Sequence, residues 1–387
     1  MMMRCAAVLL GLPALARGAG LTDDPIAADS VTYLDSSDTV TWTASSSAGF
    51  SIAAKVPGDL LTDLEAAGKI GDPLYELNWL NATIWNNYTW TYSTTFAMPS
   101  GAGTPLLVFD GVKMGAKIML NGKLIATAND QFMRYVFPLE KGALLATNKL
   151  DVVFDPAIDC AGRWMACTGG WDWAPYTNTA QDGIPTMTKG IWKSVSIVEV
   201  GSAAITAIVP QIFYSGDYPM EPLTDETHKG FAVDVKVFTW AAAETKGTLS
   251  VTGSWATGAE QLPVATQTVT VPKGNSSTTA KLTAGPGSVK LWWPAGHGAQ
   301  PLYNITVTFT PASVATTAAG VVSATRRVGF RHFAVVTGDD TDAAYVAASK
   351  GKEGTDRLGM LWRINGAAIF SKGANSAMQL SHPEFCL

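Results

Sequence analysis

The sequence predicts an all-β protein built from two successive sandwiches, and three observations support this class. Apolar and polar residues alternate with a period of two in many segments, as in strands with one buried face. The 37 glycines and 20 prolines suit many short strands joined by turns. With 47% hydrophobic and 15% charged residues, the chain of 387 residues has the composition of a globular protein, and its length suggests two or three modules.

The first set of strand signals extends to about Val200. Alternation runs through residues 50–56, 90–96 and 191–197. Asn121-Gly122, between two such stretches, readily adopts the positive φ values of a type I′ turn and predicts a hairpin. One helix is expected at residues 60–67, where Asp59 can cap the first turn and Gly68 suits the end.

A second set of strand signals follows the Gly/Ser/Ala stretch at residues 201–204. It runs from 205 to 331 and is clearest at 231–238, 248–252, 268–271 and 303–309. We therefore expect a larger sandwich of about 170 residues, then an immunoglobulin-like sandwich of about 130. After a polar, acidic stretch at 337–354, apolar residues 360–364 and 367–370 flank Asn365-Gly366, which predicts another hairpin.

The N-terminus predicts entry into the secretory pathway. Residues 1–20 combine Arg4, a short apolar run and small residues, as in a signal peptide, although a short buried helix is an alternative. No later apolar run reaches the roughly 18 to 20 residues of a membrane span, so the mature chain is expected to be soluble. Four N-x-S/T sequences favour N-glycosylation, at Asn81, Asn87, Asn275 and Asn304.

Cysteine and charge patterns narrow the possible partners. In an oxidising compartment Cys160 and Cys167 could close a small disulfide loop, whereas Cys386 is left unpaired. The net charge is −5, and no basic run is longer than Arg326-Arg327, so neither nucleic acid nor an anionic membrane is predicted as a partner. The four histidines have no metal-ligand spacing and no cofactor motif is present, so no metal or cofactor is predicted.

The segment Gly169-Gly170-Trp171-Asp172-Trp173-Ala174-Pro175 is the best candidate for a functional site. The flanking Gly-Gly and Ala-Pro pairs place it on a loop. Indole faces stack on the C–H faces of a pyranose, and a carboxylate accepts hydrogen bonds from two adjacent hydroxyls. The alternative is structural, with the tryptophans filling the end of the sandwich and Asp172 capping backbone N–H groups.

The order of motifs along the chain resembles the β-mannosidase branch of glycoside hydrolase family 2. In the first half the resemblance rests on Val56-Pro57-Gly58, Asp72-Pro73, Trp90-Thr91-Tyr92, Phe109-Asp110-Gly111, Leu120-Asn121-Gly122, Trp171-Asp172-Trp173 and Gly190-Ile191-Trp192. In the second half it rests on Leu291-Trp292-Trp293-Pro294, Gln300-Pro301-Leu302-Tyr303, Arg327-Val328-Gly329-Phe330-Arg331, Ile364-Asn365-Gly366 and Phe370-Ser371-Lys372-Gly373-Ala374-Asn375.

This resemblance implies a domain order and a role for the loop. After the signal peptide predicted at 1–20, it implies a galactose-binding-like jelly-roll sandwich at 21–200, an immunoglobulin-like sandwich at 201–332, and a linker with the first hairpin of a (β/α)₈ barrel at 333–387. Asp172, its neighbours Trp171 and Trp173, and Asn375 would contact a terminal mannose. The family cleaves the glycosidic bond with two barrel glutamates, and nothing in residues 1–387 matches either one.

The chain also departs from the family pattern. After Asn375 a tryptophan is expected, but Ser376 follows, and the roughly 200 residues that a barrel needs are not in this sequence. No catalytic residue is therefore assigned. The leading hypothesis is a secreted or lysosomal β-mannosidase-like segment that is inactive alone. The alternatives are a secreted, non-catalytic carbohydrate-binding protein and an adhesion module with no sugar role.

Overall fold

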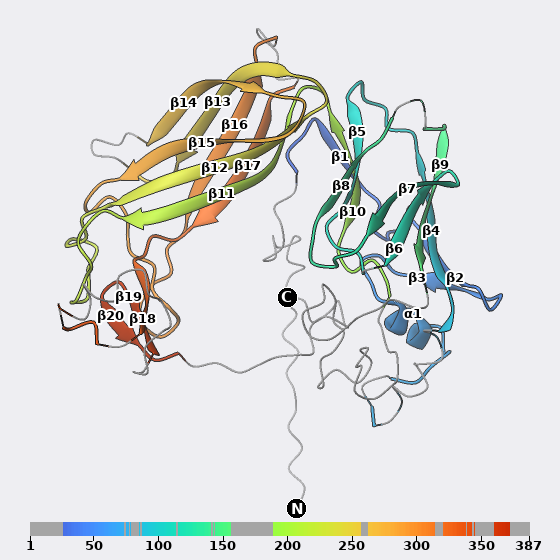
Figure 1. Cartoon of the computed structure of the whole chain (residues 1–387), viewed down its shortest axis with the longest axis horizontal. Coiled ribbons are helices and arrows are strands. Elements are labelled where there is room, and N and C mark those ends of the chain that lie inside the picture. The colour runs from blue at the N-terminus through green and yellow to red at the C-terminus, as the bar shows by residue number, and fades with distance from the viewer. Residues whose placement is uncertain are drawn as a thin grey trace, which may run out of the picture.

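The computed structural model describes residues 26–371, apart from 73–74, 77, 79–84, 86, 114, 141, 143, 156–188, 257–261, 314–319, 338, 343 and 345–359. Within these ranges the chain consists mainly of antiparallel strands, together with the helix α1 (Leu60–Ala66) (Figure 1). The predicted all-β class is confirmed. None of the described helices is long and apolar enough to cross a membrane.

Two sheets form the first sandwich. The larger has the order β3-β2-β4-β9-β6-β7 and the smaller the order β1-β10-β5-β8. The strands of the larger sheet are β2 (Trp42–Ser46), β3 (Ser51–Ala54), β4 (Trp90–Ala97), β6 (Ala116–Leu120), β7 (Lys123–Ala128) and β9 (Thr147–Phe154). Those of the smaller sheet are β1 (Ser30–Tyr33), β5 (Thr104–Phe109), β8 (Tyr135–Pro138) and β10 (Val195–Val200). Trp90, Tyr92, Phe109 and Phe154 lie buried between the sheets.

Seven of the described strands form the second sandwich, the number found in immunoglobulin-like domains. One sheet has the order β11-β12-β15 and the other β14-β13-β16-β17. Their bounds are β11 (Ala204–Tyr214), β12 (Phe231–Ala241), β13 (Thr245–Gly253), β14 (Val264–Val271), β15 (Gly274–Ala284), β16 (Tyr303–Pro311) and β17 (Val322–Val328). The alternating burial along β12 and β16 places Phe231 and Phe309 in the core beside Trp255 and Phe330.

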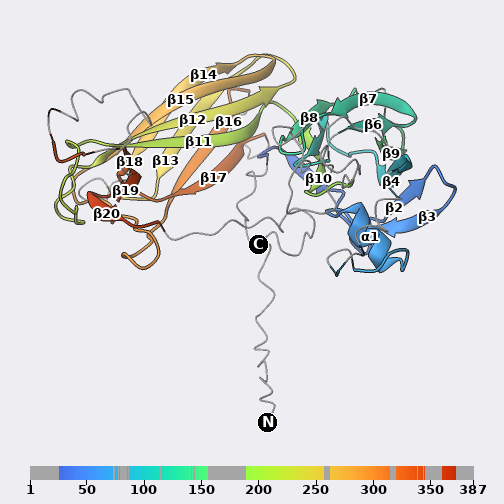
Figure 2. The same cartoon turned by 60° about the horizontal axis from the view of Figure 1, so that its bottom comes forward.

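A small third sheet follows, with strands β18 (Phe333–Thr337), β19 (Met360–Ile364) and β20 (Ala367–Ile369). Figures 1 and 2 show it at the end of the second sandwich that is farther from the first. The two sandwiches meet through an apolar cluster that includes Leu106, Val198 and Trp240. The predicted residue limits of the domains stay a prediction.

The local turn and cap predictions are confirmed. Asn121 and Gly122 have φ values of 50° and 80°, and the corresponding residues of the later hairpin, Asn365 and Gly366, have 49° and 83°. These left-handed conformations match the right-handed twist of the strands they join. The Asp59 side chain accepts a hydrogen bond from the Leu61 N–H at the start of α1, as an N-cap residue does.

Two strand predictions were incomplete. The strand expected at residues 191–197 begins at Val195, because the preceding backbone bonds to other loops: the Lys193 N–H donates to the Gly111 carbonyl and the Asp110 N–H to the Ser194 carbonyl. β15 was not among the clearer signals, because it is rich in Ser and Thr and its exposed positions outnumber its buried ones.

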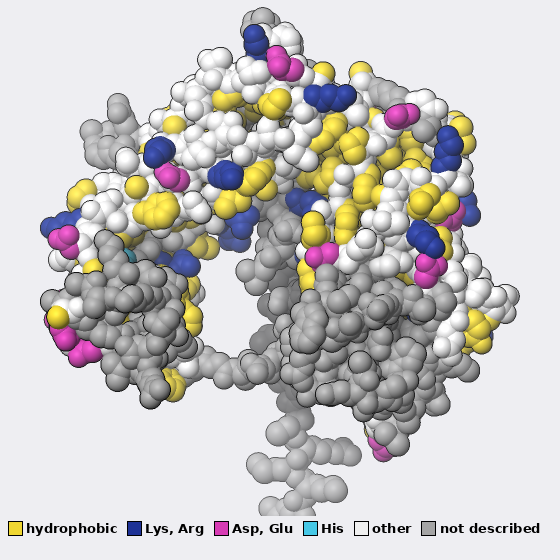
Figure 3. Space-filling view, viewed as in Figure 1, with side chains coloured by type: hydrophobic (Ala, Val, Ile, Leu, Met, Phe, Trp, Pro, Cys, Tyr) yellow, Lys and Arg dark blue, Asp and Glu magenta, His cyan; other side chains and the backbone are white. Residues whose placement is uncertain are grey.

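Charged side chains are dispersed over the surface seen in Figure 3. On this face lysines and arginines lie singly or in small groups, many of them near acidic side chains, and no large patch of one sign appears among the described residues. Long-range attraction of a nucleic acid would need a basic patch or stripe. The face shown in Figure 3 therefore carries no basic patch of that kind among the described residues.

Candidate functional site

The predicted sugar-contacting residues fall outside the described residues. Trp171, Asp172 and Trp173 lie in the segment 156–188, as do Cys160 and Cys167, and Asn375 lies in 372–387. Their roles stay predictions. Among the predicted glycosylation sites Asn81 is also outside, whereas Asn87, Asn275 and Asn304 are described and exposed, as an acceptor asparagine must be.

The residues that follow the segment 156–188 are held firmly by backbone hydrogen bonds. The Lys189 carbonyl accepts from the Leu60 N–H at 2.8 Å, and the Gly190 carbonyl accepts from the Lys113 N–H at 3.0 Å. The Ile191 carbonyl accepts from the Gly58 N–H at 2.8 Å. The end of the segment that carries the predicted site is therefore fixed against the start of α1 and the loop after β5.

Gly190 is required at this junction for two reasons. Its φ of +140° is one that side-chain-bearing residues rarely adopt. A Cβ atom there would come within 2.8 Å of the Gly58 carbonyl oxygen and 3.0 Å of the Asp59 Cα. The close backbone approach that anchors the segment depends on the absence of a side chain at residue 190.

The residues before the segment belong to the centre of the larger sheet. Phe154, the last residue of β9, pairs with Trp90 on β4 and with Ala116 on β6, and its side chain is fully buried. Asp155 follows and makes an exposed ion pair with Lys117 at 2.7 Å. The described residues on both sides of the segment, Phe154 and residues 189–191, are therefore fixed to the first sandwich.

A cluster of buried charged groups includes Lys189, the first described residue after the segment. Lys189, Lys113 and Asp59 are each about 1% exposed. The Lys113 ammonium lies 3.8 Å from the Asp59 Oδ2, an ion pair longer than a hydrogen bond. Such pairs cost desolvation free energy, and removing one member leaves the other charge buried without its partner.

The second carboxylate of this cluster, Asp63, is held by two donors. The Tyr92 hydroxyl donates to its Oδ2 at 2.9 Å and the Lys55 N–H to its Oδ1 at 3.0 Å. Tyr92 is fully buried in the sandwich core, whereas Lys55 follows β3. Asp63 therefore connects the helix to β4 and to the end of β3, both in the larger sheet.

Burial shifts the pKa values of this cluster. It raises the pKa of Asp63 to about 7, against the smaller opposing effect of the hydrogen bond from Tyr92. Burial also lowers the pKa of Lys189 to about 8, and the nearby Asp59 carboxylate opposes that change. The pKa of Tyr92 is raised well above its usual value, first by burial and then by the charge of Asp63.

A surface hollow of about 340 Å³ lies beside the cluster, lined by Lys55, Thr62, Asp63 and neighbouring small residues. Perturbed carboxyls in hollows are often functional. Here both Asp63 oxygens are already engaged by the protein, which favours a structural role. Within the described ranges no group of three or more His, Cys, Asp or Glu side chains is placed to hold a metal ion.

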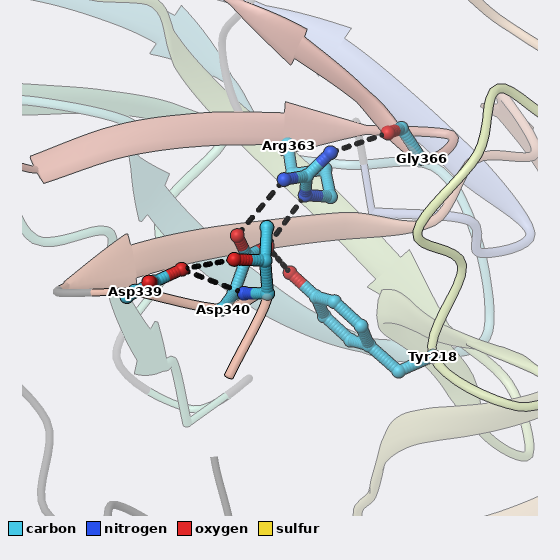
Figure 4. A network of polar contacts seen from close by, with 6 residues as sticks. Tyr218, Asp339, Asp340, Arg363 and Gly366 are labelled. Carbon is cyan, nitrogen blue, oxygen red and sulfur yellow. Dashed lines mark hydrogen bonds and ion pairs between the residues drawn. The ribbon is translucent and has the colours of Figure 1, made fainter. Parts of the chain in front are cut away.

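The hairpin that leads toward Asn375 is tied to the second sandwich by polar contacts (Figure 4). The Arg363 guanidinium donates to both Asp340 carboxylate oxygens, at 2.6 and 2.9 Å, and to the Gly366 carbonyl at 2.8 Å. The Tyr218 hydroxyl donates to Asp340 at 3.0 Å. The Leu223 N–H donates to the carbonyl of the buried Asn365 at 2.8 Å, so the turn is fixed from several directions.

Sequence reasoning identified the cap Asp59 and the turn Asn365-Gly366 but missed the buried charged cluster. The nearest sequence signal was Asp63, four residues after the predicted cap Asp59. Lys113 and Lys189 stand in apolar surroundings that a one-dimensional pattern does not reveal.

Comparisons with known proteins agree with this architecture. Residues 41–164 match the family described as the glycosyl hydrolase 2 galactose-binding domain-like family. A β-mannosidase B from Emericella nidulans is 30% identical over 278 residues, which cover 65% of this chain and 30% of that protein. A β-mannosidase from Mus musculus is 25% identical over 370 residues, covering 86% of this chain and 37% of that protein. The chain thus spans about a third of the length of these curated relatives.

Solved structures share the fold. A β-D-mannosidase from Dictyoglomus thermophilum superposes with a TM-score of 0.65 at 21% identity, covering 90% of this chain and 40% of that one. An exo-chitosanase from Amycolatopsis orientalis superposes with a TM-score of 0.61 at 18% identity, covering 88% and 36%. At these identities the likeness concerns the fold alone.

Proposed function

Because this chain is a segment of a glycoside hydrolase family 2 protein, we propose that it forms the sugar-binding front part of a β-mannosidase-type retaining glycosidase. Its role is to present Asp172 and the adjoining tryptophans to a terminal β-linked mannose. The observation that carries this proposal is the anchoring of residues 189–191, which fixes one end of the predicted loop to the sandwich. The likeness to β-mannosidases over most of the chain supports the choice of sugar.

In this proposal the chain binds sugar and the rest of the enzyme cleaves it. Retaining hydrolysis needs a carboxylic acid and a carboxylate about 5 to 5.5 Å apart across the scissile bond. The buried carboxyls of the first sandwich do not suit this role, because Asp59 is occupied with Lys113 and the helix cap, and Asp63 with Tyr92 and Lys55. We therefore expect no hydrolysis by residues 1–387 alone.

The route of the chain through the cell is part of the same proposal. The signal-like residues 1–20 and the exposed acceptors Asn87, Asn275 and Asn304 support entry into the secretory pathway, with a secreted or lysosomal destination. In that compartment Cys160 and Cys167 can form a disulfide that braces the loop carrying Asp172.

The test combines a binding and an activity measurement on the purified chain. Saturation-transfer NMR with methyl β-D-mannopyranoside should show transfer that is lost in Asp172→Ala and Trp173→Ala. It should persist in Asp217→Ala, an exposed aspartate of the second sandwich. An aryl β-mannoside should not be hydrolysed above background. Absence of binding by the unmodified chain, or binding that survives both loop substitutions, would contradict the proposed role of the loop.

A non-catalytic carbohydrate-binding protein remains the second candidate, because the anchored loop could bind sugar without a partner domain. The two proposals differ in what restores activity. If a barrel from a homologous β-mannosidase, fused after residue 387, produces hydrolysis that depends on Asp172, the enzyme segment is supported. If the fusion folds and binds sugar but never hydrolyses it, the binding protein is supported.

A further inference from the structure

A groove of about 570 Å³ lies at the edge of the second sandwich, where β11 and β17 come together. Three of the nine arginines in the sequence line it, Arg326, Arg327 and Arg331, beside Trp292, Leu302 and Phe333. The described residues that line it include no Asp or Glu. We propose that this groove is a second carbohydrate site, which binds a sugar that carries a carboxylate or sulfate group.

Strand register places the arginines on two sides of β17. Arg326 lies opposite Ile305 and therefore on the face that carries the core residues Val322 and Val328. Arg327 lies opposite the exposed Asn304 and points to the other face. β17 is the last strand of its sheet among the described residues, so Arg326 and Arg327 lie at the edge of that sheet beside β11.

Arg331 and Trp292 contact each other within the groove. The Arg331 guanidinium lies 4.7 Å from the centre of the Trp292 ring, a cation–π contact. A Cβ at Gly329 would meet the Trp292 side chain at 2.9 Å, so the indole lies directly against the backbone there. A guanidinium that lies over an aromatic ring keeps its N–H groups available to an oxyanion in the guanidinium plane.

Two of the three groove arginines have no carboxylate partner among the described residues. Arg134 and Arg363 each contact a carboxylate, at 2.7 and 2.6 Å. Arg327 and Arg331, by contrast, make no ion pair with any described residue. A guanidinium binds a carboxylate or sulfate through paired N–H···O bonds, which are stronger than neutral hydrogen bonds. Two such groups in one concave site favour an anionic ligand.

Two features favour an acidic sugar over an acidic peptide. The half-exposed Phe333 and Leu302 give apolar surface beside the arginines, and the volume lies in the range of about 300 to 1,000 Å³ that is usual for small-ligand sites. β11, the outer strand of the facing sheet, contains Pro210, which lacks the N–H that a peptide pairing with that edge would need.

Isothermal titration calorimetry at low ionic strength tests this proposal with four probes. Hyaluronan tetrasaccharide carries carboxylates, chondroitin sulfate tetrasaccharide adds sulfates, chitotetraose is a neutral sugar of the same length, and hexaglutamate is an acidic peptide. We expect the two anionic sugars to bind, and the one that binds more tightly identifies the preferred oxyanion. Chitotetraose lacks an anionic group and hexaglutamate lacks a sugar ring, so each should bind at least about tenfold more weakly.

Matched variants locate the binding. The double change Arg327→Gln and Arg331→Gln should weaken the anionic sugars by about tenfold or more, whereas Lys273→Gln, an exposed lysine of the same sandwich, should leave them unchanged. Asp172→Ala should also leave them unchanged, which separates this site from the proposed mannose site. Equal binding by chitotetraose, tighter binding by hexaglutamate, or full binding by the arginine double variant would each overturn the proposal.

Discussion

The Tyr92 hydroxyl donates a 2.9 Å hydrogen bond to the carboxylate of Asp63 inside the first sandwich. Tyr92 is fully buried and Asp63 nearly so. A strand of the sheet and the short helix α1 are therefore joined through an ionisable group that water barely reaches. The consequence is that the stability of this sandwich depends on the protonation of one carboxyl.

Asp63 should make the first sandwich less stable as pH rises toward neutrality. Burial raises its pKa from the usual 3.8 to about 7, so the folded chain holds this proton more tightly than the unfolded chain. The stabilising contribution is complete below pH 3.8 and is lost as pH rises through about 7. In urea titrations Asp63→Asn should flatten this dependence between these pH values, because the amide does not ionise.

Other carboxyls also titrate in this pH range. The measurement therefore compares how the free energy of unfolding depends on pH in the unmodified chain and in Asp63→Asn. The matched control Asp217→Asn changes an exposed aspartate and should keep the slope of the unmodified chain. If Asp63→Asn also keeps that slope, the carboxyl is ionised in the folded protein at low pH and the burial argument is wrong.

Gly190→Ala should loosen the anchored end of the segment 156–188 without unfolding the sandwich. The substitution places a side chain at a φ of +140° and within 2.8 Å of the Gly58 carbonyl oxygen. Strain of this kind costs about 1 to 3 kcal/mol. We expect a lower free energy of unfolding and, if the proposed function is correct, weaker transfer to methyl β-D-mannopyranoside in NMR.

Gly142→Ala is the matched control, because a Cβ there meets no atom within 4 Å. It should leave both stability and sugar binding unchanged. A Gly190→Ala protein that is as stable as the unmodified chain would show that the junction can relax. The close approach to Gly58 would then have no role in placing the loop.

The features that the sequence predicted are local, and those it did not predict depend on residues far apart in the chain. Asn121-Gly122 and Asn365-Gly366 form the expected turns because their own backbone preferences decide φ. Asp59 caps α1 because its acceptor and the donor at Leu61 are two residues apart. The ion pair of Lys113 with Asp59 requires the sandwich to bring together separate parts of the chain.

The start of β10 illustrates the same limit. Alternating residues 191–197 predicted one continuous strand, but residues 189–193 bond to the helix start and to the loop after β5. Ile191 is buried for that reason, and not because it belongs to the sheet. Alternation reports which side chains are buried, and several backbone paths can bury the same side chains.

Expression in a eukaryotic secretory host should attach N-glycans at Asn87, Asn275 and Asn304. All three are exposed, and each begins an N-x-S/T sequence. Peptide mass spectrometry after enzymatic glycan release converts each occupied asparagine to aspartate and so identifies the sites. The triple Asn→Gln variant should lose these glycans. A secreted chain that carries no glycan at any of the three would contradict the prediction.

Arg363→Lys should loosen the hairpin of β19 and β20 from the second sandwich. Lysine keeps the charge but cannot donate at the same time to both Asp340 oxygens and to the Gly366 carbonyl, as Arg363 does. Losing such charge-assisted bonds costs about 1.5 to 3 kcal/mol. Hydrogen exchange should become faster at the Leu223 amide, which donates to the Asn365 carbonyl. Lys290→Arg, at an exposed site of the same sandwich, should change nothing.

The pH dependence of this contact has the opposite sign to that of Asp63. Hydrogen bonds from Arg363 lower the pKa of Asp340 below its usual 3.8, against the opposing effect of burial. Its stabilising contribution is therefore present above pH 3.8 and is lost as pH falls through the lowered pKa. At acidic pH the Leu223 amide of the unmodified chain should exchange as fast as it does in Asp340→Asn, because residue 340 then carries no charge in either protein. If protection at Leu223 is the same in both proteins at neutral pH, the carboxylate does not hold the hairpin, and the hydrogen bonds of Asn365 itself fix the turn.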